Sequence, residues 1–442
     1  MSMKKFMAVT AIAALSVAGL SACSSSDSGS GNEKGSVYFL NWKPEAETAY
    51  QAIAKEYKEK TGIEVKVATA ASGNYEQTLK TEITKSDAPT MFQVNGPVGL
   101  ESWHKYTLDI TDSEIAKNLK DDGLALKGED GKIYGVPVAI EGYGIIYNEE
   151  IMDKYFAMPG AKAKSMDEIK DFAKLKEVVE DMQAHKADLG IDGVFAATSL
   201  ASGEDWRWQT HLANIPMYYE YMADGVTDTK EAKFTFANEF KNIFDLYLDN
   251  STVDKAVTPS KTVSDSMAEF ALGKAAMVQN GNWAWGQINE QAGNTVKEDK
   301  IKFLPIYTGH QGEEKQGLAV GTEAFLAVNA KASEADQKAT MDFINWLFTS
   351  DEGKKHVVDD LGFNAPFKSF SEAEVPNDPL AKEIAKYTSN TELKAVPWVF
   401  TTFPSQKFKE DFGQSLAQYA SGNSAWEDSV KIFVEGWKAE KK

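Results

Sequence analysis

The sequence contains a single cysteine, Cys23, among its 442 residues. One cysteine cannot form a disulfide within the chain, so packing and hydrogen bonds must hold the fold together. Arginine is equally scarce: the sequence has one arginine, Arg207, and 46 lysines. The formal net charge of −19 argues against nucleic acid or an anionic membrane surface as the main partner.

Several motifs of catalysis are also missing. The histidines are scattered, and no helix is expected to pair two of them, so neither a metal site nor a cofactor is predicted. A P-loop, a complete GxGxxG after a strand and a GxSxG are absent. Carboxylates are numerous, and their count alone leaves a glycosidase pair open.

The N-terminus reads as an export signal. Lys4 and Lys5 precede the apolar run 6–20, which is short for a membrane span, and Leu20-Ser-Ala-Cys23 resembles a bacterial lipobox. We expect residues 1–22 to be a lipoprotein signal peptide and 23–35 to be the lipidated Cys23 with a flexible tether. The protein would then be lipid-anchored at the extracellular face of the cytoplasmic membrane. The alternative is an ordinary signal peptide with a chance cysteine.

Strands and helices alternate along the rest of the chain. A buried strand over 37–41, a helix over 45–60 and a strand over 63–68 predict a β-α-β unit, and a third strand follows at 90–94. Both halves show this alternation, which fits an α/β fold of two lobes. Because ligands bind beyond the carboxyl ends of such strands, Trp42 and Asn95 are expected near a common rim.

The stretch 131–148, GKIYGVPVAIEGYGIIYN, predicts two strands joined end to end. Pro137 interrupts the first strand, Glu141 and Tyr143 stand at the joint, and Asn148 is expected to cap a helix over 149–156. Such a joint could carry the chain from one lobe to the other. The alternative is an ordinary bent strand with an exposed glutamate.

Aromatic side chains at predicted strand ends and loops suggest a sugar site. Aromatic rings cover the apolar faces of sugar rings, while carboxylates, amides and a guanidinium fork bind the hydroxyls. The candidate ligand-binding residues are Trp42, Glu45, Asn95, Glu141, Tyr143, Trp206, Arg207, Trp283, Glu323 and Trp398. Core packing for each tryptophan, and an ion pair for Arg207, are the alternatives. Trp103, Trp346, Trp426 and Trp437 are expected in cores.

Five stretches carry a family resemblance: the lipobox at 20–23, the joint at 131–148, FALGKAAMVQNGNWAWGQI at 270–288, AVGTEAFLAVN at 319–329, and DFINWLFTSDEGKKHV with GFNAPF at 342–367. Together they resemble the extracellular solute-binding proteins (family 1, maltose-binding-protein-like) of bacterial carbohydrate ABC transporters, of the lipoprotein type.

The resemblance implies a two-lobe, periplasmic-binding-protein-like fold, each lobe a mostly parallel sheet flanked by helices. Three hinge crossings are expected, in 140–146 and near 308–312 and 349–353. The implied lobes are 36–143 plus 310–350 and 144–309 plus 351–442. The NGxWAW motif places the family's cleft tryptophan at Trp283, and Glu141 and Tyr143 match its hinge-side contacts.

The function implied by the resemblance is binding a short oligosaccharide, such as a maltooligosaccharide or another α-glucoside or α-galactoside. The sugar would pass to ABC permease subunits, and the protein would be a monomer and not an enzyme. The alternatives are a binding protein for a non-sugar solute, or a secreted glycosidase that uses Glu141 and Glu323.

Overall fold

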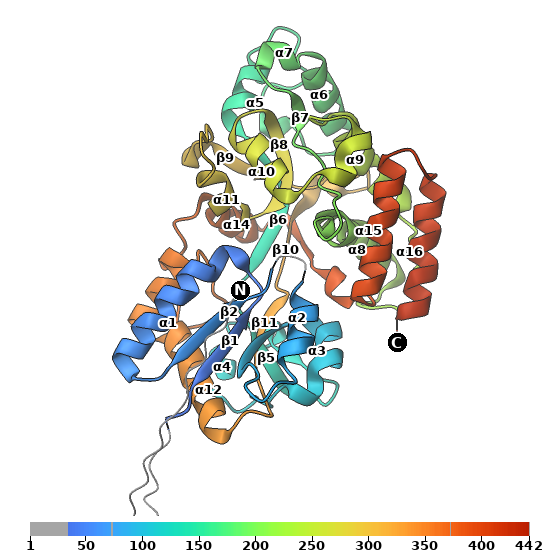
Figure 1. Ribbon diagram of the computed structural model, residues 1–442. Helices are drawn as coiled ribbons and strands as arrows, with labels where there is room; N and C mark the ends of the chain where they lie inside the picture. Colours follow the sequence, from blue (N-terminus) through green and yellow to red (C-terminus); the bar gives the residue numbers. More distant parts are fainter. Residues whose placement is uncertain (1–33, 72–73, 372, 442) are drawn as a thin grey trace, which may run out of the picture. The chain divides into compact units, whose positions relative to one another are not determined.

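The computed structural model describes residues 34–71, 74–371 and 373–441, and Lys34–Lys442 forms one compact unit (Figure 1). The predicted signal peptide, the lipidation site Cys23 and nearly all of the predicted tether lie outside the described residues. Within the described ranges, no helix combines the length and the apolar character needed to cross a membrane.

Strands in the described residues form two sheets. The first sheet has the order β2-β1-β3-β11-β5-β4. Its strands are β1 (Val37–Asn41), β2 (Val65–Thr69), β3 (Met91–Asn95), β4 (Leu126–Lys127), β5 (Ile133–Pro137) and β11 (Ala324–Val328). The second sheet has the order β12-β10-β6-β8-β7, with β9 also paired to β6. Its strands are β6 (Glu141–Asn148), β7 (Gly193–Phe195), β8 (Ala275–Gly281), β9 (Ile301–Leu304), β10 (Gln316–Gly321) and β12 (Lys394–Pro397).

Strand directions confirm the expectation of mostly parallel sheets, with one reversed strand in the second sheet and two in the first. In the second sheet β6 is antiparallel to β8, β9 and β10, while β7 and β12 run with β8 and β10. In the first sheet β11 runs against β3 and β5, which share the direction of β1 and β2, and the short edge strand β4 also runs against β5. Two of these reversed strands, β6 and β11, follow directly on a passage between the sheets.

Within the described residues the chain passes between the two sheets three times. The first passage lies between β5 and β6, and the second between β10 and β11. The third lies after Phe370, which packs in the first-sheet core, and before α14 (Pro379–Ser389), which packs on the second sheet. The chain therefore enters and leaves each lobe at one end of its sheet, where β6 and β11 begin.

The strand pairing corrects two of the predicted lobe boundaries. Residues 316–321 were assigned to the first lobe, yet β10 pairs with β6 in the second sheet. Residues 351–370 were assigned to the second lobe, yet Val357, Phe363 and Phe367 pack in the core of the first. The lobe to which each segment belongs is decided by the core in which its apolar side chains pack. The spacing of the family motifs along the sequence does not show that packing.

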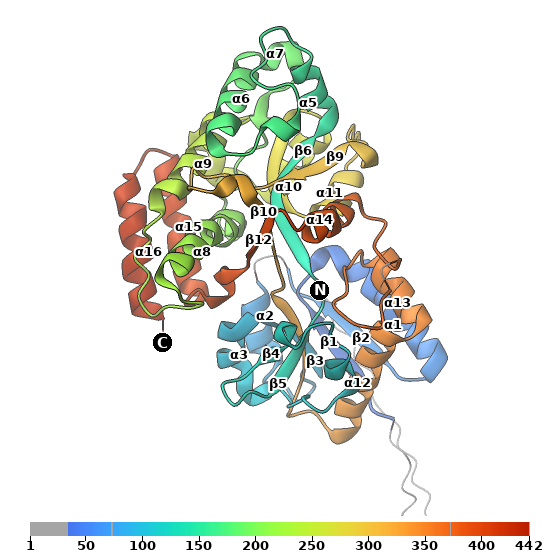
Figure 2. The ribbon, with the colours of Figure 1, turned by 180° about the vertical axis from the view of Figure 1, so that it is seen from behind.

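Helices cover both faces of the first sheet. On one face α1 (Glu47–Thr61) and α12 (Glu334–Thr349) share a core with β1, β5 and β11, and on the other α2 (Tyr75–Glu82) and α3 (Gly96–Trp103) pack on β1 and β3 (Figures 1 and 2). The remaining described helices are α4 (Glu114–Lys117), α5 (Glu149–Phe156), α6 (Phe172–Ala184), α7 (Lys186–Leu189), α8 (Ala213–Asp224), α9 (Ala237–Asp249), α10 (Val263–Ala271), α11 (Ala284–Asn289), α13 (Asp351–Lys355), α15 (Gln406–Ala420) and α16 (Trp426–Glu440).

Local signals explain where several elements begin. The side chain of Asn148 accepts a hydrogen bond of 3.0 Å from the Glu150 N–H, which confirms the predicted cap of α5. Pro137 is the last residue of β5, so its missing N–H ends the strand just before the first passage. Trp426 and Trp437 are buried in the second-lobe core, as expected, whereas Trp346 is only half-buried against Tyr57 and Phe343.

Candidate functional site

The direction of β6 gathers several chain segments at one edge of the second sheet. Glu141, the first residue of β6, pairs with Gly321 at the end of β10, and Tyr143 pairs with Gly281 at the end of β8. β12 ends beside β10, where Pro397 pairs with Val320. The residues that follow these strand ends, including Trp283, Glu323 and Trp398, are therefore brought to the same edge, where α/β sheets usually bind ligands.

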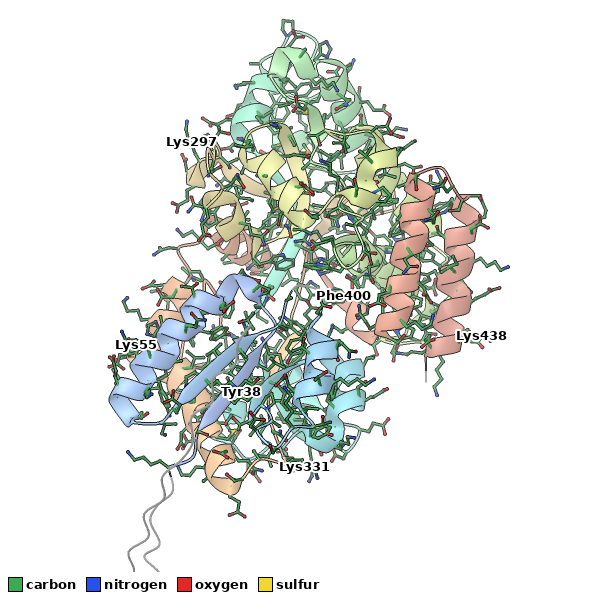
Figure 3. All side chains as sticks on the ribbon, viewed as in Figure 1. Tyr38, Lys55, Lys297, Lys331, Phe400 and Lys438 are labelled. Atoms are coloured by element: carbon green, nitrogen blue, oxygen red, sulfur yellow. The ribbon has the colours of Figure 1, made fainter. Side chains whose placement is uncertain are left out.

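Six rings form a continuous group at this edge, which we call the aromatic cluster: Tyr143, Trp206, His211, Trp283, Trp398 and Phe400. His211 is at its centre. Its ring stacks on Tyr143 with centroids 4.3 Å apart, and it lies 4.7 Å from Trp206 and 5.5 Å from Trp283. Figure 3 labels Phe400, whose ring is 5.2 Å from that of Trp398.

Two glycines make room for the tryptophans of the cluster. A Cβ added at Gly281 would lie 2.2 Å from the Trp283 ring, and one at Gly321 would lie 2.6 Å from the Trp398 ring. Each indole therefore lies directly over the backbone at the end of a strand, in a space that any side chain would fill. The glycines at these strand ends are thus part of how the sequence positions the rings.

Several buried polar atoms of this group have no hydrogen-bond partner among the described residues. They are Nη1 of Arg207, Nε2 of His211, and the indole Nε1 of Trp283 and of Trp398. Arg207 is held in place because its Nε donates to Oδ1 of Asn280 at 3.0 Å and its guanidinium lies 4.1 Å from the Trp206 ring centroid. Buried polar groups are normally paired, so this group of unpaired atoms marks a place where a ligand would complete the hydrogen bonding.

Charged residues of the first lobe face the aromatic cluster. Lys43, which follows β1, lies 5.9 Å from the Trp283 ring centroid and donates to Oε1 of Glu141 at 2.8 Å. The more distant Glu45 lies 3.8 Å from the same ammonium and is exposed. Although burial opposes it, the field of these two carboxylates raises the pKa of Lys43, so the ammonium stays charged.

Glu323 and Lys409 are a second pair of opposite charges near Lys43 and Glu141. Glu323 lies in the passage between β10 and β11, and burial raises its pKa to about 7 although Lys409 opposes the shift. Lys409 lies on α15 of the second lobe, and burial lowers its pKa against the field of Glu323 and Glu76. Both groups are held in a protein environment that disfavours their charged forms.

The lobes also touch beside the cluster. A Cβ added at Gly96, the first residue of α3, would lie 3.0 Å from the Cβ of Thr401, which follows Phe400. Oδ1 of the neighbouring Asn95 is buried, and no described residue forms a hydrogen bond with it. The ring of Trp42 instead packs edge-on against Tyr75 at 5.5 Å and supports the first-lobe cores.

The structure brings most of the predicted site residues together. Glu141, Trp206, Arg207, Trp283 and Trp398 lie in or beside the aromatic cluster, and Glu45, Asn95 and Glu323 come from the segments that face it. Tyr143 differs from the expectation of a ligand contact, because it has no exposed surface and its hydroxyl donates to the His211 carbonyl at 2.9 Å. In this structure Tyr143 holds His211 in place through ring stacking and this hydrogen bond.

Sequence reasoning missed His211, Lys43, Phe400 and Lys409. His211 follows Arg207 by four residues in a helical turn, Arg207–Leu212, which places both on one face, and this spacing was the available signal. Lys43 and Lys409 had no signal among so many lysines. Burial lowers the pKa of His211 well below its ordinary value, so its ring is neutral. Among the described residues no His, Cys, Asp and Glu group is arranged to hold a metal ion.

Comparison with known proteins places this chain in a family. Residues 52–383 match the family model described as bacterial extracellular solute-binding protein. The melibiose/raffinose/stachyose-binding protein MelE of Bacillus subtilis is 26% identical over 292 residues, 65% of this chain and 64% of its own length. A maltooligosaccharide ABC transporter solute-binding lipoprotein of Streptococcus pneumoniae is 23% identical over 466 residues, 98% of this chain and 97% of its own.

Solved structures share the fold. A chitin oligosaccharide binding protein matches with a TM-score of 0.71 and 21% identity, covering 92% of this chain and 98% of its own. The solute-binding protein RafE in complex with raffinose matches with a TM-score of 0.70 and 18% identity, over 92% and 100% of the two chains. The fold is thus the two-lobe α/β fold of solute-binding proteins, and the chain belongs to the bacterial extracellular solute-binding protein family.

Proposed function

We propose that this protein binds a short oligosaccharide against the aromatic cluster and delivers it to an ABC importer. The observation that carries the proposal is the set of buried atoms of Arg207, His211, Trp283 and Trp398 that find no partner among the described residues, beside the half-buried rings of Trp206 and Trp283. A sugar ring offers both things that such a surface needs, namely apolar C–H faces for the indoles and hydroxyl oxygens for the unpaired donors. The relatives named for raffinose, stachyose and maltooligosaccharides support this class of ligand.

Closure of the two lobes over the sugar would follow from the placement of the charged groups. Lys43 belongs to the first lobe and its partner Glu141 to the second. Lys409 belongs to the second lobe, and Glu323 lies in the second passage between the lobes. A ligand that contacts groups of both lobes binds the closed arrangement better than an open one and so shifts the population toward it.

The membrane partner and the anchor belong to the same proposal. We propose that Cys23 carries the lipid anchor at the extracellular face of the membrane, that the permease subunits of an ABC transporter receive the sugar, and that the protein is a monomer. The name of the pneumococcal relative, a lipoprotein of an ABC transporter, supports the anchor and the partner. Mass spectrometry of the membrane-extracted protein should show a diacylglyceryl-modified Cys23, and an unmodified chain that starts elsewhere would refute the anchor.

A glycosidase that pairs Glu141 with Glu323 is the alternative from another class. The Lys43 ammonium at 2.8 Å already neutralises Glu141, so the structure favours a structural role for this carboxylate over that of a nucleophile. Incubating the bound sugar overnight with the protein and analysing it by chromatography tests this point. We expect the sugar to be unchanged, and hydrolysis products would show an enzyme.

Calorimetry with a panel of oligosaccharides tests the binding itself. We expect at least one di- to pentasaccharide to bind with Kd of about 1 μM or tighter, as a closed aromatic site allows. If every sugar is silent while a peptide or polyamine binds, the site serves a non-sugar solute.

A further inference from the structure

The guanidinium of Arg207 is buried without a counter-charge. Its side chain is 3% exposed, and in the described part of the chain it forms no ion pair with a carboxylate. Its protein contacts are the amide oxygen of Asn280 and the face of Trp206, both of them uncharged. Burial lowers its pKa to about 9, which shows how strongly this environment disfavours the charge. Buried charges in proteins are normally paired, so this one is unusual.

Neighbouring unpaired atoms lack the same kind of partner. Nη1 of Arg207 and Nε1 of Trp283 and of Trp398 are hydrogen-bond donors that cannot accept. Trp206 links them, because its ring lies 4.1 Å from the guanidinium and 6.0 Å from the Trp283 ring, which lies 6.4 Å from Trp398. A ligand that forms hydrogen bonds with these donors must present oxygen lone pairs to them.

The electrostatic field at the centre of the cluster is positive. Besides burial, the groups that depress the pKa of His211 are Arg207, Lys409 and Lys43, all of them cations. Lys43 is offset by Glu141 and Glu45, and Lys409 by Glu323 and Glu76. Lys43 forms an ion pair with Glu141, whereas the carboxylates that act on Lys409 and on Arg207 do so without a direct contact among the described residues. Arg207 is the more buried of these two cations and lies against the Trp206 ring of the aromatic cluster, so it is the cation that a ligand would have to pair.

We propose that the oligosaccharide bound here carries a carboxylate, as in a uronic acid unit, and that Arg207 pairs with this carboxylate beside the indole N–H groups. This inference rests on the proposed function and narrows its substrate class. The guanidinium fork matches a carboxylate in a planar, bidentate geometry. Two neighbouring hydroxyls of a neutral sugar, or a buried water, would satisfy the hydrogen bonds but would leave the charge without a partner.

Matched pairs of sugars test the inference. The probes are raffinose, maltotriose and galactotriose, each with the analogue in which one or more C6 hydroxymethyl groups are oxidised to the carboxylate, including trigalacturonate. Binding to residues 24–442, which contain the whole compact unit, is measured by calorimetry at pH 7 in 20 mM and 300 mM salt. We expect one acidic form to bind about tenfold tighter than its neutral partner, as a charge-assisted hydrogen bond exceeds a neutral one, and the advantage to shrink in high salt.

Two variants assign the effect to Arg207. Arg207→Gln should bring the ratio of acidic to neutral affinity to about one, and Arg207→Lys, which keeps the charge and loses the fork, should keep part of the preference. Lys55→Gln, on the exposed side of α1 and labelled in Figure 3, removes one positive charge elsewhere and should leave the ratio unchanged. Circular dichroism confirms that each variant is folded.

The outcomes separate the inference from the function on which it rests. A neutral sugar that binds as tightly as its acidic partner, or tighter, overturns the carboxylate inference and leaves oligosaccharide binding intact. An acidic preference that persists in Arg207→Gln overturns the assignment to this residue. If no probe of either kind binds, the proposed function itself fails.

Discussion

Nζ of Lys43 lies 2.8 Å from Oε1 of Glu141, although the two residues are 98 positions apart in the chain. Lys43 follows the first strand of the first sheet, and Glu141 opens β6 of the second sheet, directly after the first passage between the lobes. Both side chains are buried, at 8% and 4% exposure. The pair therefore joins the lobes next to the aromatic cluster.

Removing one member of this pair should be costly. Glu141→Gln leaves the buried ammonium with Glu45 alone, at 3.8 Å, and should lower the free energy of unfolding by about 2–4 kcal/mol. Lys43→Met combined with Glu141→Gln removes both charges and should restore part of this loss. Urea denaturation of the three variants measures both effects. Equal stability of Glu141→Gln and the parent protein would show that the pair is not coupled.

Trp283→Ala should weaken sugar binding by about 2–4 kcal/mol, because a half-buried indole at the cluster is lost while the fold keeps its cores. Trp285→Ala is the matched control. Trp285 is two residues away and equally half-buried, but it packs against the core on the other side of the sheet, with Ile288 and Leu380. Calorimetry should therefore show near-normal binding for this control. Similar losses in both variants would mean that Trp283 acts through the fold.

The fold could be predicted from the sequence largely because its signals are local. The strand over 37–41, the helix over 149–156 and the Asn148 cap were predicted with their observed bounds, since bulk, periodicity and capping act within a few residues. The same kind of local signal starts α6 at Phe172, because the side chain of Asp171 accepts a hydrogen bond from the Lys174 N–H.

The lobe boundaries and half of the site depend instead on contacts between distant residues. The pairing of β10 with β6 decides which lobe holds 316–321, and nothing within those residues reveals the partner strand. Lys43 resembles every other lysine until β1 and β6 place it beside Glu141. Tyr143 was predicted to touch the ligand, and only the three-dimensional structure shows that the ring of His211, 4.3 Å away, covers its face.

Gly281→Ala should weaken sugar binding although residue 281 itself has no side chain. The new methyl group would lie 2.2 Å from the far edge of the Trp283 ring, which can swing away and leave its position in the cluster. We expect a loss of affinity of about 1–3 kcal/mol, approaching that of Trp283→Ala. Trp283 fluorescence should shift to the red as the ring becomes hydrated.

Gly286→Ala is the control for this substitution, because a Cβ at Gly286 meets no atom within 4 Å. Its affinity and its fluorescence should match those of the parent protein. Unchanged affinity in Gly281→Ala would contradict the proposal that Gly281 leaves room for the Trp283 ring in the binding site.

Glu323 should make stability depend on pH. Its pKa is raised to about 7 in the folded protein, above the ordinary value of 4.5, so the folded state holds the proton more tightly than the unfolded state does. Its contribution is fully present below pH 4.5 and is lost as the pH rises through 7. Glu323→Gln should therefore change stability little at pH 4.5. At pH 8 it should increase the free energy of unfolding by about 1–3 kcal/mol relative to the parent and raise the melting temperature accordingly.

The control for this prediction is Glu352→Gln, since Glu352 is an exposed carboxylate paired with Lys60. That variant should show no gain in stability at pH 8. Parallel melting curves for Glu323→Gln and the parent from pH 4.5 to 8 would contradict the burial of Glu323.

Oligosaccharide binding at the aromatic cluster is best tested by a thermal-shift screen of residues 24–442. The panel holds α- and β-linked oligosaccharides, neutral and acidic, and is run on the parent protein and on Trp283→Ala in parallel. A sugar at a hundredfold excess over its Kd stabilises the folded state by about 2.7 kcal/mol. We expect a shift with one linkage series in the parent protein and a much smaller one in Trp283→Ala. A flat panel, or a shift of the same size in both proteins, would contradict it.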